Sequence, residues 1–388
     1  MSRLDELIKE LCPDGVKFES LTTIFDTKNG YTPSKSNKSF WENGTVPWFR
    51  MEDIRENGHI LSKAMQYVTK SAVKGNPFPA NSFIIATSAT IGEHALITVP
   101  SLANQRFTYL VLKDAYKEKF NIKFLFYYCF KLDEYCKQYL NQSNFASVDM
   151  KKFEKFSFPI LPLEIQDKIV RILDSFTEYI ALLEKELELR KKQYAYYRDQ
   201  LLSFAHLKTT VLEQWTIGEV AIVSRGIRVV KKQLETTGNI PVYQNSIIPL
   251  GYHKKSNCPK NTAFIIGAGA AGEIGFSYVD FWAADDCYYF ICSEKILNKY
   301  IYYILLSKSD FIKSKVRKAS IPRLARSVIE KLLIPVPPIK EQERIVAILD
   351  RFDRLCNDLT NGLPAEITAR QKQYEYYRDR LLNFKKLN

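Results

Sequence analysis

The side chains best suited to chemistry in this chain are cations and amides that gather in two separate segments, 16–157 and 208–333. Arg and Lys suit guanine and phosphate, Asn and Gln suit adenine, and Lys with backbone amides gives a salt-sensitive affinity for polyanions. Any single residue of these types is more often an ordinary solvated surface residue than a binding residue. The prediction therefore rests on the groups and not on their individual members. The candidates in the first segment are Lys28, Asn29, Tyr31, Lys35, Lys38, Arg50, Gln105 and Arg106. The candidates in the second segment are Arg225, Arg228, Lys231, Lys232, Gln244, Asn245, Lys254, Lys255, Arg317, Lys318 and Arg323.

The formal net charge of +13 is concentrated in the same two segments. Segment 16–157 holds 19 basic and 13 acidic residues, a balance of +6, and segment 208–333 holds 18 and 10, a balance of +8. The stretches outside them together carry −1. A generally basic proteome would spread the charge evenly, whereas this distribution is typical of a protein that contacts a polyanion at two places.

The sequence offers little for catalysis, metal binding or a nucleotide cofactor. Its four His and seven Cys form no CxxC or HExxH pattern, which predicts no zinc site and reduced, mostly buried thiols. Gly267–Gly272 matches G-x-G-x-x-G, but a strand-like stretch at 276–282 follows it instead of a helix. This favours a glycine-rich hairpin over a nucleotide site. We therefore expect no catalytic residue, no metal and no cofactor held by this chain.

The same composition favours a folded cytoplasmic protein. Apolar residues make up 46% of the chain, yet no stretch approaches eighteen consecutive apolar residues, so no membrane span is expected. The first ten residues mix acids and bases without an apolar core, which is unlike a signal peptide.

The elements that must position these groups occur twice in the sequence. Lys192–Phe204, KQYAYYRDQLLSF, returns as Lys372–Phe384, KQYEYYRDRLLNF. A second stretch, 158–176, matches 334–352, and each copy places prolines just before an apolar helical pattern. The duplication predicts two equivalent halves, which suits a ligand that itself has two parts.

Each copy contains a heptad-like apolar seam with steps of three or four residues. Over roughly 40 residues this predicts a helix on the order of 60 Å long. The second copy should be kinked or broken at Asn361–Pro364, which adds four residues relative to the first. We expect the two helices to form an antiparallel intramolecular coiled coil; the alternative is that each packs only on its own domain. The seam of the first copy is Ile165, Ile169, Ile172, Phe176, Tyr179, Leu183, Leu187, Tyr194, Tyr197, Leu201 and Phe204, and that of the second is Ile345, Ile348, Phe352, Leu355, Leu359, Ile367, Tyr374, Tyr377, Leu381 and Phe384.

The two charged segments are typical of mixed α/β domains. Ile85–Leu112 maps onto Ile265–Cys292 with a constant shift of 180, while the intervening loops differ, as expected of two reading heads on one scaffold. The fold class expected is therefore two mixed α/β domains joined by two long helices, with an internal pseudo-twofold duplication. The strands expected are 82–87, 107–112, 263–266 and 288–292, and the domain helices are 122–140 and 300–316. The predicted division is an N-terminal segment at 1–15, a first α/β domain at 16–157, a long helix at 158–207, a second α/β domain at 208–333 and a second long helix at 334–388.

Two such domains, each followed by a proline-led helix ending in K-Q-Y-x-Y-Y-R-D-x-L-L, resemble the specificity subunit of a type I restriction–modification enzyme. The opening Leu7–Val16 is also similar to that family's first segment. The resemblance implies a non-catalytic subunit whose two target-recognition domains each read one half of a bipartite double-stranded DNA site, with the helices setting the gap. It further implies two docked modification (methyltransferase) subunits, which bring S-adenosylmethionine, and restriction subunits outside them. Helix faces bearing Arg198–Asp199 and Arg378–Asp379 are candidates for the docking.

Two other classes of protein fit parts of the sequence. A coiled-coil scaffold with two non-specific nucleic-acid-binding ends would bind without regard to sequence, with an affinity set by salt. An enzyme that used the glycine-rich segment would bind a nucleotide and lose it on Gly269→Glu. The duplicated architecture favours the DNA-reading subunit over both.

Overall fold

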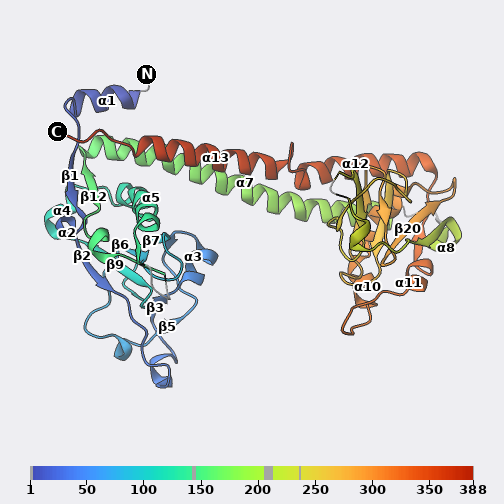
Figure 1. Cartoon of the computed structure of the whole chain (residues 1–388), viewed down its shortest axis with the longest axis horizontal. Coiled ribbons are helices and arrows are strands. Elements are labelled where there is room, and N and C mark those ends of the chain that lie inside the picture. Colours follow the sequence, from blue (N-terminus) through green and yellow to red (C-terminus); the bar gives the residue numbers. More distant parts are fainter. Residues whose placement is uncertain (1–2, 142–145, 205–212, 236, 388) are drawn as a thin grey trace. The chain divides into compact units, whose positions relative to one another are not determined.

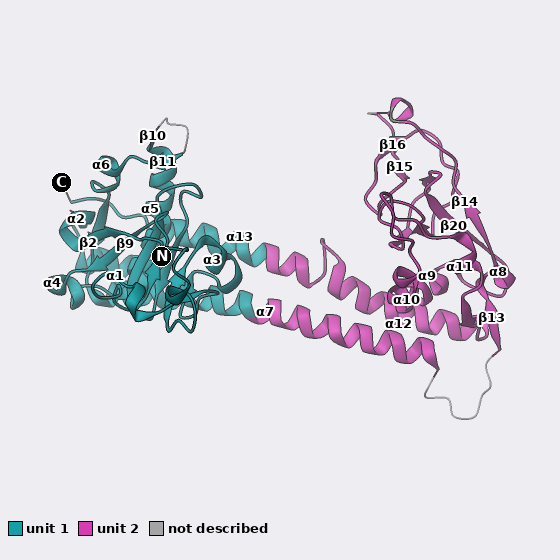
Figure 2. Ribbon diagram, turned by 90° about the horizontal axis from the view of Figure 1, so that it is seen from below, with its two compact units in different colours: residues 1–181, 369–388 teal, residues 182–368 magenta. Residues whose placement is uncertain are grey.

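The computed structural model describes residues 3–141, 146–204, 213–235 and 237–387 (Figure 1). The chain divides into two compact units, which are described separately below. Unit 1 comprises residues 1–181 and 369–388, and unit 2 comprises residues 182–368 (Figure 2, teal and magenta).

Unit 1 is built on a mixed five-stranded sheet in the order β2-β9-β6-β7-β4, in which only the β4–β7 pair is parallel. All five residues of β6 are buried, because the sheet is covered on both faces by apolar side chains. Helix α5 packs against the sheet at β7. The sheet strands are β2 (Phe25–Asn29), β4 (Ile60–Leu61), β6 (Ser82–Ala86), β7 (His94–Ile97) and β9 (Phe107–Leu112), and the helix is α5 (Ile122–Gln138). A smaller sheet contains β3 (Val46–Phe49), β5 (Tyr67–Val68) and β8 (Leu102–Ala103), and a separate pair joins β1 (Lys17–Ser20) to β12 (Ser157–Ile160).

Unit 2 repeats this plan with a four-stranded antiparallel sheet in the order β14-β20-β17-β18. The order of the first four strands of unit 1, β2-β9-β6-β7, is thus the same. The sheet strands are β14 (Ala221–Arg225), β17 (Thr262–Ile266), β18 (Ile274–Ser277) and β20 (Cys287–Cys292). The smaller sheet contains β15 (Ile240–Tyr243), β16 (Gly251–His253) and β19 (Trp282–Ala283), a separate pair joins β13 (Gln214–Thr216) to β21 (Leu333–Pro335), and the helices are α9 (Asn298–Ser307), α10 (Ser309–Ser314) and α11 (Arg326–Glu330).

Short elements connect these layers. In unit 1 they are α1 (Arg3–Leu11), α2 (Leu21–Ile24), η1 (Lys38–Phe40), α3 (Met51–Asn57), η2 (Lys70–Ala72), α4 (Asp114–Lys117), β10 (Leu140–Asn141), β11 (Ser147–Val148) and α6 (Met150–Phe153). In unit 2 they are α8 (Ile217–Val220) and η3 (Lys231–Gln233).

One glycine in each unit follows the first strand of the larger sheet and lies against the end of a strand of the smaller sheet, β8 or β19. A Cβ at Gly30 would lie 2.5 Å from the Ala103 carbonyl oxygen, and a Cβ at Gly226 would lie 2.3 Å from that of Ala283. Only glycine allows so close a backbone approach. The same local geometry therefore recurs in both units although few of the loop residues agree.

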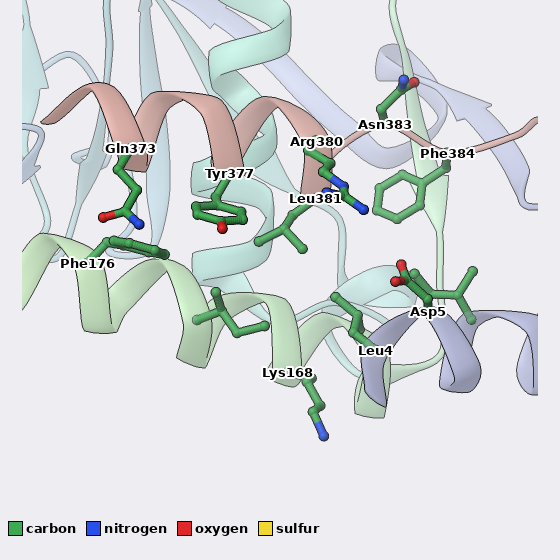
Figure 3. A pocket seen from close by; sticks show the side chains of 12 residues that line it. Leu4, Asp5, Lys168, Phe176, Gln373, Tyr377, Arg380, Leu381, Asn383 and Phe384 are labelled. Carbon is green, nitrogen blue, oxygen red and sulfur yellow. The ribbon is translucent and has the colours of Figure 1, made fainter. Parts of the chain in front are cut away.

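The predicted coiled coil is present in each unit as an antiparallel helix pair. Helix α7 (Leu163–Ser203) is 41 residues long, which confirms the expected length. In unit 1 its Phe176 stacks on Tyr377 of α13 (Leu363–Leu381) at 5.5 Å between ring centroids (Figure 3). The later Tyr179 meets the earlier Arg370, so the two helices run antiparallel. In unit 2 the later part of α7 pairs in the same way with α12 (Ile339–Asn357).

The second helix is broken where the sequence predicted it. Helix α12 ends at Asn357 and α13 begins at Leu363. The Asp358 carboxylate accepts the backbone N–H groups of Thr360 at 2.7 Å and Asn361 at 3.2 Å, which fixes the turn between the helices. Pro364 then lies in the first turn of α13, where its missing N–H costs no helical hydrogen bond.

Three details of the expected elements were wrong. The helix expected at 300–316 is two helices, because α9 ends at Ser307 and α10 begins at Ser309. The strand expected at 276–282 is interrupted, because β18 ends at Ser277 and β19 begins at Trp282. Some seam positions are exposed: Tyr179 is 44% exposed, Tyr197 is 43% exposed, and Leu359 is 80% exposed because it falls in the break.

A buried glutamine fastens each α/β domain to its own long helix. The Gln166 amide of α7 donates to the Lys119 and Leu161 carbonyls at 2.9 and 2.8 Å, and its oxygen accepts the Asn121 N–H at 2.9 Å. Gln342 of α12 is the equivalent residue in unit 2, where its three bonds join Lys295, Pro337 and Leu297 at 2.8, 2.8 and 2.9 Å. Neither glutamine is exposed to solvent.

A carboxylate about two turns further along each helix completes the attachment. In unit 1 Asp174 accepts from Lys123 and from the Tyr127 hydroxyl, both at 2.7 Å. In unit 2 Asp350 accepts from the Tyr303 hydroxyl and lies 3.6 Å from the Lys299 ammonium. Burial among aromatic rings lowers the pKa of Lys299, and Asp350 opposes that effect by stabilising the charged form. We call the glutamine and carboxylate contacts together the clasp.

Candidate nucleic-acid interface

Three predicted cations of unit 1 line one pocket. Lys35, Lys38 and Arg50 surround a space of about 330 Å³ together with Trp41, Glu42 and Gln66. The Arg50 guanidinium lies 5.7 Å from the ring centroid of Trp48, whose ring Trp41 meets edge-on. A pocket with cations and an aromatic face suits a phosphate or a base edge.

Helix α3 fixes the backbone of Arg50 at the wall of this pocket. The carboxylate of the buried Asp53 accepts the Arg50 backbone N–H at 2.7 Å and the Met65 N–H at 2.6 Å. The guanidinium remains half-buried, at 26% side-chain exposure, and its Nε lies 3.8 Å from Glu52. The position of Arg50 is therefore set by the fold rather than by a flexible loop.

The other candidates of unit 1 lie before Lys35 or after Arg50 in the sequence, and three of them make hydrogen bonds with neighbouring loops or strands. The Gln105 side chain accepts from the Thr32 hydroxyl at 2.5 Å, which joins its loop to the loop carrying Lys35. Asn29 is exposed, and its amide oxygen accepts from Thr108 at 3.0 Å. Tyr31 is half-buried, and its hydroxyl accepts the Lys74 N–H at 2.6 Å. Lys28 and Arg106 are exposed at the ends of paired strands β2 and β9.

In unit 2 the glycine-rich segment forms a hairpin turn between antiparallel β17 and β18, which confirms the expected hairpin. The turn holds together two candidate groups that are distant in sequence. Ala270 donates its N–H to the Asn245 carbonyl at 2.9 Å, and Leu324 donates to the Gly267 carbonyl at 2.8 Å. A Cβ at Gly269, whose φ is +87°, would lie 2.7 Å from Asn245 Cβ, so glycine is required there.

A basic hairpin, 317–323, is hydrogen-bonded to this turn. Arg317 and Arg323 exchange two backbone hydrogen bonds, at 2.8 and 3.2 Å, and both side chains and that of Lys318 are exposed. Like charges held together in this way repel one another unless an anion lies between them. The structure therefore brings Asn245, Arg317 and Arg323 to one place, which their spacing in the sequence did not reveal.

The remaining candidates of unit 2 are spread over its loops. Arg225 is exposed and donates to the Asp285 carbonyl at 2.5 Å, and Lys254 pairs with Glu235 at 2.6 Å. Gln244 is half-buried. Arg228, Lys232 and Lys255 are exposed, and the side chain of Lys231 lies outside the described part of the chain. The DNA-binding role of all nineteen candidate residues remains a prediction.

Sequence reasoning left out one pair of residues that occupies the same turn as two candidates of unit 1. The shift of 180 that aligns the strands puts Gln105 and Arg106 of unit 1 at the positions of Asp285 and Asp286 of unit 2. Each pair occupies the turn before the equivalent strands β9 and β20. The candidates were chosen among cations and amides, which leaves out these carboxylates, although the register of Ile85–Leu112 onto Ile265–Cys292 already aligns them with Gln105 and Arg106.

The described residues contain no group of three or more His, Cys, Asp or Glu side chains that could hold a metal ion. Within the same residues, none of the helices is both long enough and apolar enough to cross a membrane. All seven cysteines are free, and five of them are buried, as expected.

Comparison with known proteins identifies the family. The chain matches the family described as "Type I restriction modification DNA specificity domain" over residues 13–190 and again over 212–369. It is 42% identical over 379 residues to the type I restriction enzyme EcoprrI specificity subunit of Escherichia coli, covering 93% of both chains. Two solved structures share the fold. One is the type I restriction-modification S subunit from M. genitalium, with a TM-score of 0.58 and 17% identity over 95% of this chain and 96% of the other. The other comes from work on complex assembly and conformational transition of the type I system, with a TM-score of 0.66 and 14% identity over 96% and 98%.

The family match occurs twice: the first covers one α/β domain and most of α7, and the second covers the other α/β domain, α12 and the start of α13. The relatives are named specificity subunits, not methyltransferases or nucleases. The chain therefore belongs to the type I restriction–modification specificity subunits, the non-catalytic components that carry the DNA-recognition domains.

Proposed function

We propose that this chain reads a bipartite double-stranded DNA sequence, with each α/β domain contacting one half-site. The observation that carries the proposal is that the two α/β domains share one strand framework but carry different residues in the turns beside it. The strand order and the close approach at Gly30 and Gly226 agree between the units, whereas the turn that holds Gln105–Arg106 in unit 1 holds Asp285–Asp286 in unit 2. Each base edge presents its own pattern of hydrogen-bond donors and acceptors. Different turn residues on one framework should therefore read different half-sites.

In this proposal the long helices set the gap between the half-sites and dock two modification subunits. Arg198–Asp199 and Arg378–Asp379 form matching ion pairs, at 2.9 and 3.0 Å, on the helix faces predicted to dock. The modification subunits would bring S-adenosylmethionine, restriction subunits would join outside them, and the complex would act in the cytoplasm. The basic loops of both domains would supply the phosphate contacts.

Methylation mapping tests the proposal. The chain is co-expressed with its modification subunit in a methylation-free bacterial host, and the genome is sequenced by a modification-sensitive long-read method. Methylated adenine confined to one two-part motif with a constant gap is the expected result. If a co-purified complex with a catalytically competent modification subunit methylates no defined motif, the proposal fails. The scaffold with two non-specific nucleic-acid-binding ends would then be favoured, and its binding would depend on salt but not on sequence.

A further inference from the structure

Each smaller sheet contains one pair of parallel strands that end at the same edge. In unit 1 the pair is β3 and β8, and in unit 2 it is β15 and β19. The carboxyl ends of parallel strands are a frequent place for ligands in α/β sheets. One residue after the first strand and two residues of the turn after the second strand lie at this edge, and we call them the edge trio. The trio of unit 1 is Arg50, Gln105 and Arg106, and that of unit 2 is Gln244, Asp285 and Asp286.

The same backbone hydrogen bonds hold the edge trio in both units. The turn that carries two of its residues is closed by a bond from Phe107 to the Asn104 carbonyl at 3.2 Å in unit 1, and from Cys287 to the Ala284 carbonyl at 2.9 Å in unit 2. The Asn104 N–H also donates to the carbonyl of Phe49, the last residue of β3, at 3.0 Å, and the equivalent bond in unit 2 is 2.8 Å long. The backbone therefore places the three side chains of each trio at matching points.

The trio of unit 1 offers hydrogen-bond donors. Arg50 and Arg106 carry guanidinium groups, which only donate. The amide oxygen of Gln105 accepts from the Thr32 hydroxyl at 2.5 Å, which leaves its NH2 group to donate. The Nε of Arg50 is buried and has no hydrogen-bond partner within the part of the chain that the structure describes. An unpartnered buried polar atom is costly, so this trio suits a ligand that carries acceptors.

The trio of unit 2 offers mainly acceptors. The carboxylates of Asp285 and Asp286 only accept, whereas the Gln244 amide both donates and accepts. Among the described residues, Oδ1 of Asp285 is buried without a hydrogen-bond partner. Two carboxylates on a domain with a charge balance of +8 repel the phosphates that the domain would otherwise attract. They fit an interface with DNA only where a donor of the ligand meets them.

We propose that the two edge trios select the bases of the two half-sites in the major groove. The trio of unit 1 reads guanine, whose O6 and N7 are both acceptors. The trio of unit 2 reads exocyclic amino groups, with Gln244 suited to adenine and Asp285 and Asp286 suited to cytosine. The inference rests on the proposed function and names the base chemistry that each half-site presents.

Each trio also rejects the base edge that the other accepts. Guanine opposite Asp285 and Asp286 brings acceptors against acceptors, which repel one another. An amino group opposite Arg50 and Arg106 brings donors against donors and leaves both sides without partners. The opposite character of the two trios therefore keeps each unit on its own half-site and gives the complex one orientation on the DNA.

Exchange of the turn residues tests the inference in the full complex with the modification subunit. Asp285→Gln combined with Asp286→Arg gives unit 2 the turn residues of unit 1, and Gln105→Asp combined with Arg106→Asp makes the reverse exchange. Both pairs already occur on this backbone turn, so the variants should fold. In methylation mapping, each exchange should change the half-site of the altered unit at the contacted bases and leave the other half-site as it was. Affinity for the original sequence should fall about tenfold or more.

Base analogues identify the groups that are read. In DNA-binding measurements at fixed salt, 7-deazaguanine, which lacks N7, should weaken binding about tenfold or more at a guanine of the first half-site. An adenine replaced by 2-aminopurine, which lacks the amino group at C6, should do the same in the second half-site. The exchange variant of the corresponding unit should lose this dependence on the analogue.

Asp310→Arg is the matched control, because it makes the same change of charge as Asp286→Arg at an exposed position of α10. It should leave the methylated motif unchanged. If the unaltered complex methylates a two-part motif and both exchange variants keep it, the inference is overturned while the proposed function stands. An equal change of affinity for all sequences would assign the trios to phosphate contacts and also overturn the inference. If the unaltered complex methylates no defined motif, the proposed function fails together with the inference.

Discussion

Gln105–Arg106 and Asp285–Asp286 show how much chemical difference one shared framework position can carry. The amide and the guanidinium donate hydrogen bonds, and the guanidinium suits guanine, whereas a carboxylate only accepts and suits the amino group of cytosine. Both pairs stand in the turn before the equivalent strands β9 and β20. The same backbone turn therefore carries a different hydrogen-bonding character in each unit, which is the property that a reading head needs.

Arg106→Ala should relax one position of the first half-site and leave the second half-site unchanged. A good bidentate contact between arginine and guanine discriminates by about 1–3 kcal/mol, so affinity for the preferred sequence should fall about tenfold or more. Methylation mapping of the variant complex, together with DNA binding at fixed salt, measures the change. Lys117→Ala, which removes an exposed cation paired with Asp114 on α4, should alter neither. An equal loss on all sequences would mean that Arg106 contacts phosphate and not a base.

At the scale of the element, the clasp explains how each reading head keeps a fixed orientation on its own helix. Gln166 and Gln342 each satisfy three backbone groups at the start of a long helix, and a carboxylate two turns later binds the domain helix α5 or α9. Buried polar contacts of this kind are costly when incomplete and orient strongly when complete. Their duplication indicates that orientation matters equally in both halves.

Gln342→Leu should destabilise unit 2 by about 3 kcal/mol or more, because it leaves two buried carbonyls and one N–H without partners. Urea unfolding followed by circular dichroism measures the change in the free energy of unfolding. Gln200→Leu is the matched control on an exposed position of α7, and it should change stability by less than about 0.5 kcal/mol. A Gln342→Leu variant as stable as the control would contradict the role of the clasp.

At the scale of the whole molecule, the two long helices connect the units, and the structure keeps the seam in each despite the break at 358–362. Both helices pass from one unit to the other within a few residues, after Ala181 in α7 and after Thr368 in α13. Additional heptads at these two positions would leave each unit intact and keep the apolar seam in phase.

Insertion of heptads at both positions should lengthen the gap between the half-sites, and methylation should persist only when the added length is close to a whole turn of DNA. Three heptads add about 32 Å, close to one turn of DNA, so methylation should persist with a gap longer by about ten base pairs. One heptad adds about 10 Å and rotates the half-sites relative to each other by roughly a third of a turn, so methylation should be lost. Methylation mapping distinguishes these results. Methylation of the original motif by the three-heptad variant would show that the helices do not set the gap.

Several features followed from sequence alone because their signals are local or repeated. The steps of three and four predicted α7, the four added residues predicted the break before α13, and the constant shift of 180 predicted that both sheets share a framework. The family resemblance rested on the same repeat, and the match over 13–190 and 212–369 confirms it. The division into domains at 16–157 and 208–333 stays a prediction.

Only the tertiary structure decided which distant residues meet and which repeated residues stay exposed. Asn245 and Arg323 come together because the Gly267–Gly272 turn bonds to both of their segments, and no periodicity in the sequence records such a contact. The seam pattern likewise placed both Tyr194 and Tyr197 on the packed face, whereas Tyr194 is 8% exposed and Tyr197 is 43% exposed. Helix periodicity determines which residues share a face, but burial depends on what packs against that face, and that depends on the pairing of segments far apart in the chain.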